Sequence, residues 1–164
     1  MEPIRKEKYK IKDWKNLSET QKIELIELLK SRHVKSFVPP PAVCLTKDEK
    51  PIAAIIYGLN PKTNEMELFT IATTASYRIV KDFVKRYRKT PMDVLFKFFI
   101  TKLKNEKINS FGGFFLGEGA KFIKKKEKEG LIVKNLFTKA YDIPIKKVEK
   151  PYGRPQRFRM LPNF

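Results

Sequence analysis

The side chains best suited to nucleophilic chemistry are a single cysteine, Cys44, and a single histidine, His33. A thiol becomes a nucleophile when a neighbouring base or positive charge stabilises its thiolate. Cys44 lies in an apolar, strand-like segment, whereas His33 follows the apolar face of a helical segment. We therefore expect a buried structural thiol. One cysteine and one histidine also cannot form an intramolecular disulfide or a structural zinc site.

Glycine-rich phosphate cradles are poorly represented in this sequence. No Walker-type loop is present, and the two closely spaced glycine pairs are Gly112-Gly113 and Gly117-x-Gly119. Both pairs lie in aromatic surroundings, where such glycines more often form bulges or turns than phosphate sites.

Positive charge is the strongest global feature of the chain. Lysine and arginine number 36 against 18 aspartates and glutamates, which gives a formal net charge of +18. Ten of these cations lie in Arg86-Tyr87-Arg88-Lys89, in Lys124-Lys125-Lys126 and in the stretch 150–164. Heat-adapted surfaces gain acids together with lysines, which is not the case here. We expect a polyanionic partner, either a nucleic acid or a phosphorylated ligand.

Length and composition are typical of one folded domain. The chain has 164 residues, of which 41% are hydrophobic and 12% aromatic, too many for a disordered protein. We expect a domain over residues 1–149 and a basic tail over 150–164. No apolar stretch is long enough to span a bilayer, residues 1–12 do not resemble a secretory signal, and the thiol is free. These features favour a cytoplasmic protein and leave its oligomeric state open.

Four segments have helical patterns. Ser18 and Gln21 form a capping box ahead of apolar residues at helical spacing. A basic amphipathic helix is predicted over 77–88. Thr90, Pro91 and Asp93 then start a third helix that runs to about residue 107, and a fourth covers 118–129.

The remaining apolar segments predict strands. They cover residues 9–14, 42–46, 52–57, 65–72, 108–116, 131–133 and 137–145. Three of them form an antiparallel meander over 42–72, in which residues 66, 68, 70 and 72 alternate with 67, 69 and 71. Phe111, Phe114 and Phe115 are expected in the core, although an exposed member of this group could stack on a nucleic-acid base. The predicted fold class is α/β, a single domain with a mixed, mostly antiparallel central sheet flanked by helices.

This order of elements resembles that of the GNAT family of N-acyltransferases over residues 9–145. The meander over 42–72 looks like the family's central strands. The helix over 96–103 with the segment 108–115 looks like its helix leading to the splayed strand. Ala120-Lys121-Phe122 running to Gly130-Leu131 is similar to the family's late helix.

The resemblance implies acetyl-CoA or a related acyl-CoA as cofactor, bound where two central strands part. Residues of the third meander strand, Phe69, Thr70 and Ile71, would line that site. The pyrophosphate would lie on backbone amides at a helix N-terminus, where free N–H groups and the helix dipole favour phosphate. Candidates for this loop are Thr73, Thr74 and Ser76 with Arg78, or Arg88, Lys89 and Thr90. The first has small residues, whereas in the second Pro91 offers no N–H and Asp93 repels phosphate.

The resemblance also implies a general base on the meander and a tyrosine acid on the late helix. Glu67 and Glu65 are placed for the base, although a carboxylate on a surface strand is more often a solvent-facing polar group. The tyrosine position falls among the lysines 124–126, so Tyr141 or Tyr57 would have to supply the acid.

Three functions follow as hypotheses. The first is a divergent acyl-CoA-dependent N-acyltransferase that acts on a nucleic-acid or RNA-linked substrate. The second is a non-catalytic nucleic-acid-binding protein on the same scaffold. The third is a basic structural or virion component whose charge aids assembly.

Overall fold

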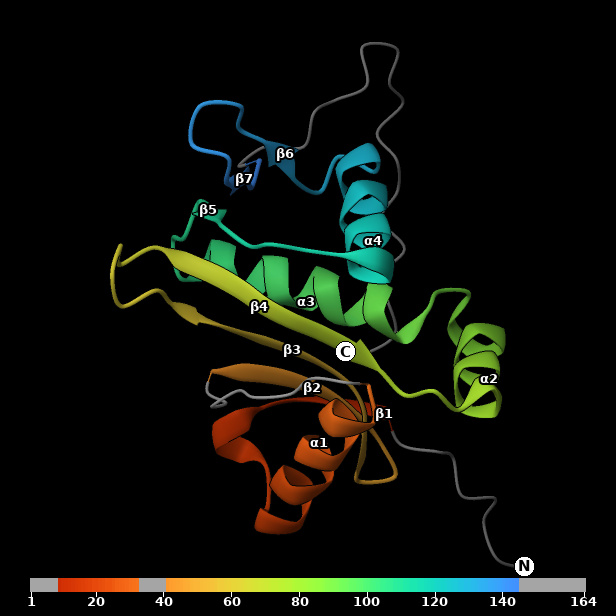
Figure 1. Ribbon diagram of the computed structural model, residues 1–164. Helices are drawn as coiled ribbons and strands as arrows, with labels where there is room; N and C mark the ends of the chain where they lie inside the picture. The colour runs from red at the N-terminus through yellow and green to blue at the C-terminus, as the bar shows by residue number, and fades with distance from the viewer. Residues whose placement is uncertain (1–8, 33–40, 145–164) are drawn as a thin grey trace, which may run out of the picture.

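The computed structural model describes residues 9–32 and 41–144 and shows a mixed α/β structure (Figure 1). Within those ranges there are four α-helices and two β-sheets with antiparallel strand pairs. The predicted α/β class and mostly antiparallel sheet are therefore confirmed. His33 and the basic stretch 150–164 lie outside the described residues.

The larger sheet consists of four strands in the order β1-β2-β3-β4. Their bounds are β1 Tyr9–Asp13, β2 Ala42–Lys47, β3 Lys50–Leu59 and β4 Met66–Thr73. The turn between β2 and β3 places Asp48 and Glu49 in the left-handed region, at φ values of 46° and 72°. Two successive residues of this kind give a tight turn that matches the twist of the two strands.

The smaller sheet has the order β5-β7-β6 and joins the larger one at a single parallel bridge. Its strands are β5 Ser110–Phe111, β6 Val133–Lys134 and β7 Tyr141–Asp142. Leu68 N donates to Gly112 O and Gly112 N donates to Met66 O, both at 2.8 Å. Read across both sheets, the strand order is β1-β2-β3-β4-β5-β7-β6.

The helices are α1 Glu19–Ser31, α2 Tyr77–Tyr87, α3 Pro91–Asn105 and α4 Gly117–Lys128. The predicted capping box of α1 is present, because Ser18 Oγ accepts from Gln21 N and Gln21 Oε1 accepts from Ser18 N. α1 covers one face of the larger sheet and α3 the other (Figure 1). None of the helices in the described ranges is both long and apolar enough to cross a membrane.

The two faces of the larger sheet carry different cores. On the α1 face the sheet contributes small side chains, including Ala42, Cys44 and Ala54, and α1 packs Leu25 and Leu29 onto them. On the α3 face the core is larger and more aromatic. It includes Phe83, Phe96, Phe99 and Phe111, all at most 1% exposed. Burial of such side chains contributes about 1.5–3 kcal/mol each and holds the sheet between the helices.

The segment 108–116 differs from its sequence prediction. Only Ser110 and Phe111 form strand β5, and the chain leaves the sheet after Gly112. As a result Phe114 is 83% exposed, so its predicted place in the core is wrong. The predicted last strand, 137–145, also begins too early: in the described residues only Tyr141 and Asp142 of this segment form β7, because Asn135 Oδ1 accepts from Phe137 N and turns the chain there.

Candidate functional site

A β-bulge interrupts β4 near its centre. Ile56 of β3 lies opposite Thr70, whereas the next residue, Tyr57, lies opposite Leu68, so Phe69 is the extra residue. The bulge ends the predicted alternation, since Leu68 and Ile71 both pack on the α3 face. Phe69 is turned over Gly58 on the other face and remains 47% exposed.

The outer edge of β4 is paired only at its beginning. Thr74 N donates to Ile52 O of β3 at 2.7 Å, so by strand alternation the backbone groups of Ile71 and Thr73 face away from β3. In the described ranges no strand pairs with this edge beyond the bridge between Glu67 and Gly112. Figure 1 shows the chain from β5 to α4 separating from β4 in this direction. The residues after the bulge therefore offer an unpaired strand edge.

The segment between β5 and α4 and the edge of β4 enclose an opening that is closed at Gly112 and widens toward α2 (Figure 1). The first turn of α4 bounds its wide end. A Cβ atom on Gly119 would lie 4.0 Å from Ile71 Cδ1, so the turn lies beside the β4 edge. At the closed end a Cβ on Gly113 would be only 2.9 Å from Leu68 O. Glycine at this position allows the two backbones to touch before they part.

Glu67 lies at the closed end of the opening, on the α1 face of the sheet. It is half-buried opposite Gly58, and its Oε1 accepts from Asn60 Nδ2 at 2.7 Å. Glu65 precedes the strand and is exposed. Of the two predicted bases, Glu67 is the one that the structure holds near the parted strands.

The two candidate tyrosines lie on the α3 side of the sheet, away from Glu67. Tyr141 is opposite Phe111 in β7 and stacks on its ring at a centroid distance of 5.7 Å. Burial, aided by Glu127, raises the pKa of Tyr141. Tyr57 packs on Phe99 of α3. The structure thus does not bring either tyrosine together with Glu67.

The two predicted phosphate loops have different surroundings. Thr73, Thr74 and Ser76 continue directly from the open edge into α2, where Ser76 Oγ accepts from Ile79 N and Arg78 is exposed. Thr90 instead forms a capping box with Asp93, whose carboxylate also pairs with Lys126. The N-terminus of α3 is therefore occupied by a carboxylate of the chain itself. Arg88 and Lys89 are exposed on the turn before it.

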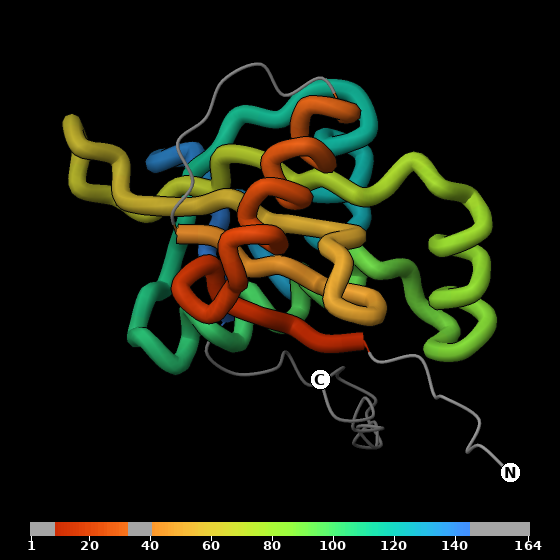
Figure 2. The backbone as a smooth tube through the Cα atoms, turned by 90° about the horizontal axis from the view of Figure 1, so that it is seen from below, coloured from red at the N-terminus to blue at the C-terminus, as the bar shows by residue number. Residues whose placement is uncertain are grey.

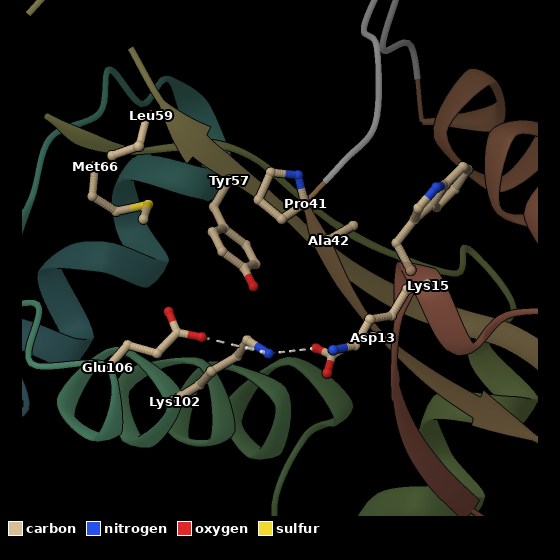
Figure 3. A pocket seen from close by; sticks show the side chains of 10 residues that line it. Asp13, Lys15, Pro41, Ala42, Tyr57, Leu59, Met66, Lys102 and Glu106 are labelled. Carbon is tan, nitrogen blue, oxygen red and sulfur yellow. Dashed lines mark hydrogen bonds and ion pairs between the residues drawn. The ribbon is translucent and has the colours of Figure 1, made fainter. Parts of the chain in front are cut away.

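A separate cavity of about 560 Å³ lies at the carboxyl end of α3 (Figure 3). Lys102 Nζ is 2.8 Å from Asp13 Oδ1 and 3.9 Å from Glu106 Oε1. The hydroxyl of Tyr57 points toward this row of charges (Figure 3), and burial raises the pKa of that hydroxyl. Asp13 and Lys102 are 89 residues apart, and no local pattern in the sequence indicates their pairing. Because the ammonium is already balanced by carboxylates, we assign this row a structural role.

Cys44 is fully buried in β2, as the sequence predicted. Burial, only partly opposed by the charge of Lys12, raises the pKa of its thiol to about 12. At pH 8 we expect iodoacetamide to modify Cys44 in the folded protein more than about a hundredfold more slowly than in concentrated urea. Mass spectrometry of time points measures both rates. Equal rates would show that the thiol is accessible in the folded chain.

Comparison with known proteins does not identify the chain. No protein-family model and no curated protein sequence matches it. Within the described ranges no group of three histidine, cysteine, aspartate or glutamate side chains is arranged to hold a metal ion. The open edge of β4 with Glu67 at its closed end is therefore the candidate functional site on geometric grounds.

Proposed function

We propose that this chain is a divergent GNAT-like N-acyltransferase that binds an acyl-CoA along the open edge of β4. One observation carries the proposal: β4 and the chain at Gly112 are bonded in parallel and then part. In the resembling family acyl-CoA lies where two central strands separate. The bulge at Phe69 and the edge of β4 at Ile71 and Thr73, which no described strand pairs, support the comparison.

The chemistry of this edge suits the extended arm of CoA. That arm carries two amide groups, which can hydrogen-bond to an unpaired strand edge as an added strand does. Its phosphates would lie at the start of α2, on the first-turn N–H groups and the side chain of Arg78. In the transfer step the acceptor amine attacks the thioester carbonyl, the C–S bond breaks, and an amide and the CoA thiol form. We assign to Glu67 the role of accepting the proton that the amine loses.

Thermal unfolding with acetyl-CoA tests the proposal. At a hundred times its dissociation constant a ligand stabilises the folded state by about 2.7 kcal/mol, which raises Tm by roughly 5–10 °C for a chain of this size. We expect this shift with acetyl-CoA and a smaller one in the variant Arg78→Ala. Lys62→Ala, in the turn between β3 and β4, is the matched control. No shift with millimolar acetyl-CoA or free CoA would contradict the proposal.

A second candidate function is nucleic-acid binding without catalysis on the same scaffold. It is favoured by the separation of Glu67 from Tyr141 and by lysines 124–126, which occupy the stretch where the family carries its acid tyrosine. A chain with this function would bind nucleic acid and release no CoA thiol from acetyl-CoA with any amine acceptor.

A further inference from the structure

Helix α2 lies beside the layered body of the protein rather than on a face of the sheet. Figure 2 shows it (light green) to one side, connected by the segments that follow β4 and precede α3. Its inner face is anchored by Phe83, which is fully buried. The ring of Phe83 lies 5.0 Å from that of Tyr9 and 4.7 Å from that of Tyr87. The helix is thus fixed in position while most of its surface faces solvent.

The outer surface of α2 carries a stripe of cations. It consists of Arg78, Lys81 and Lys85, spaced three and four residues apart on the helix, and of Arg88 and Lys89, which directly follow its end; all five are exposed. Among the described residues none of the five forms an ion pair with a carboxylate. Lysines elsewhere, such as Lys12, Lys102 and Lys126, do have such partners. Like charges at this spacing repel each other, so the stripe lowers the stability of the isolated helix.

An exposed aromatic residue stands at the amino end of the stripe. Tyr77 is 76% exposed, and Lys81 Nζ lies 5.9 Å from its ring centroid. On the helix the stripe extends from residue 78 to residue 85, about 10 Å at 1.5 Å per residue, and Arg88 and Lys89 continue it past the end of α2. Cations in a row beside an aromatic ring are how proteins bind single-stranded nucleic acid, with phosphates on the cations and a base on the ring.

A membrane surface is a poorer match for this helix. An amphipathic helix binds a bilayer by inserting its apolar face. The apolar face of α2 is committed to the core through Phe83 and Tyr87. The stripe alone is available to a partner, and the partner must therefore present anionic charge without requiring apolar insertion.

We propose that α2 binds single-stranded nucleic acid, with the cation stripe on the phosphates and Tyr77 stacked on an unpaired base. This inference does not depend on acyl transfer. If both hold, Arg78 contacts the phosphates of CoA and the rest of the stripe contacts those of the nucleic acid. The bound strand then ends near the open edge of β4, and the acceptor amine belongs to a nucleic acid or to a molecule attached to one.

Fluorescence anisotropy of the full chain with a labelled 20-mer of single-stranded RNA tests the proposal. The charge variant is Lys81→Gln/Lys85→Gln/Lys89→Gln, which leaves Arg78 intact. The control is Lys124→Gln/Lys125→Gln/Lys128→Gln, which removes the same charge from exposed positions of α4. We expect the α2 variant to bind at least tenfold more weakly at 100 mM salt. Its slope of log affinity against log salt should fall by about 2, because three contacts each contribute about 0.7.

The aromatic contact has its own readout. We expect Tyr77→Ala to weaken binding to single-stranded RNA roughly tenfold with an unchanged salt slope, and to change binding to a blunt duplex less than twofold. Equal losses in the α2 and α4 triple variants would overturn the proposal, because overall charge would then explain binding. Wild-type affinity of Tyr77→Ala, or tighter binding of α2 to anionic vesicles than to RNA, would also overturn it. Thermal unfolding of each variant checks its fold, and loss of acetyl-CoA binding alone leaves this test unaffected.

Discussion

Replacing Lys126 with methionine is expected to lower the free energy of unfolding by about 3 kcal/mol. Lys126 is only 3% exposed and pairs with Asp93 of α3 and with Glu129 Oε2, the latter at 2.9 Å. Methionine fills the space of the apolar stem but leaves the buried carboxylate of Asp93 without its counter-charge. Breaking one side of a buried pair costs about 3–5 kcal/mol. Tm should fall by roughly 6–12 °C.

Two further variants separate charge from packing. Lys125→Met, an exposed neighbour on the same helix, should change stability by less than about 0.5 kcal/mol. Adding Asp93→Asn to Lys126→Met should restore part of the loss, since the unpaired charge is then removed. Wild-type stability of Lys126→Met would mean that the pair does not join α3 to α4.

The same pair predicts a dependence of stability on pH. Burial opposes the charge of Asp93, but the hydrogen bonds from Lys126 and Thr90 outweigh it and lower the pKa of this carboxyl below its ordinary value of 3.8. Because the pKa of Asp93 is lower in the folded than in the unfolded state, its ionised form stabilises the protein at pH values above 3.8. This stabilisation is lost as the pH falls through the folded-state pKa. Lys126→Met should therefore lose less stability than the wild type on acidification below pH 4.

The second large effect is expected in acyl transfer. If the proposed function holds, Glu67→Gln should lower kcat/KM with acetyl-CoA by about 10²–10⁴-fold, the usual contribution of a general base. Glutamine keeps an oxygen that can accept from Asn60 Nδ2, so the β4 turn should retain its structure. Release of the CoA thiol, followed with a thiol reagent, measures the rate. Glu65→Gln, at the exposed neighbouring carboxylate, should stay within about twofold of the wild type.

A wild-type rate for Glu67→Gln would remove Glu67 from the mechanism while leaving the acyl-CoA site untouched. The thermal shift with acetyl-CoA reports on that site separately. If the cofactor binds and no acceptor is modified, the non-catalytic function becomes the better interpretation of the fold.

Local sequence patterns were sufficient for the elements that depend on neighbouring residues. Ser18 with Gln21 forms the predicted capping box, and Thr90 is the predicted N-cap of α3. These contacts span three residues, so no distant part of the chain is needed to make them. The burial of Cys44 and Phe99 also follows from apolar runs of strand and helix length.

The candidate site depends on the tertiary structure. Alternation along residues 65–72 predicts a regular strand, whereas pairing with β3 inserts the bulge at Phe69 and turns Ile71 to the other face. A bulge is defined by the pairing of two strands, so the sequence of one strand does not indicate it. The exposure of Phe114 likewise follows from the tertiary structure, in which the segment after Gly113 separates from β4.

Charges were the least predictable feature. By sequence, Lys126 belongs to a run of lysines typical of a solvated helix face, and Asp93 is an acid near the positive end of a helix. The packing of α4 on α3 buries one lysine of that run against this carboxylate and leaves its neighbours exposed. Composition alone shows that the protein is basic. The fold decides which cations form internal ion pairs and which, on α2, remain available to a partner. Local rules act over one helical turn, whereas a counter-charge is supplied by whichever element the fold places alongside.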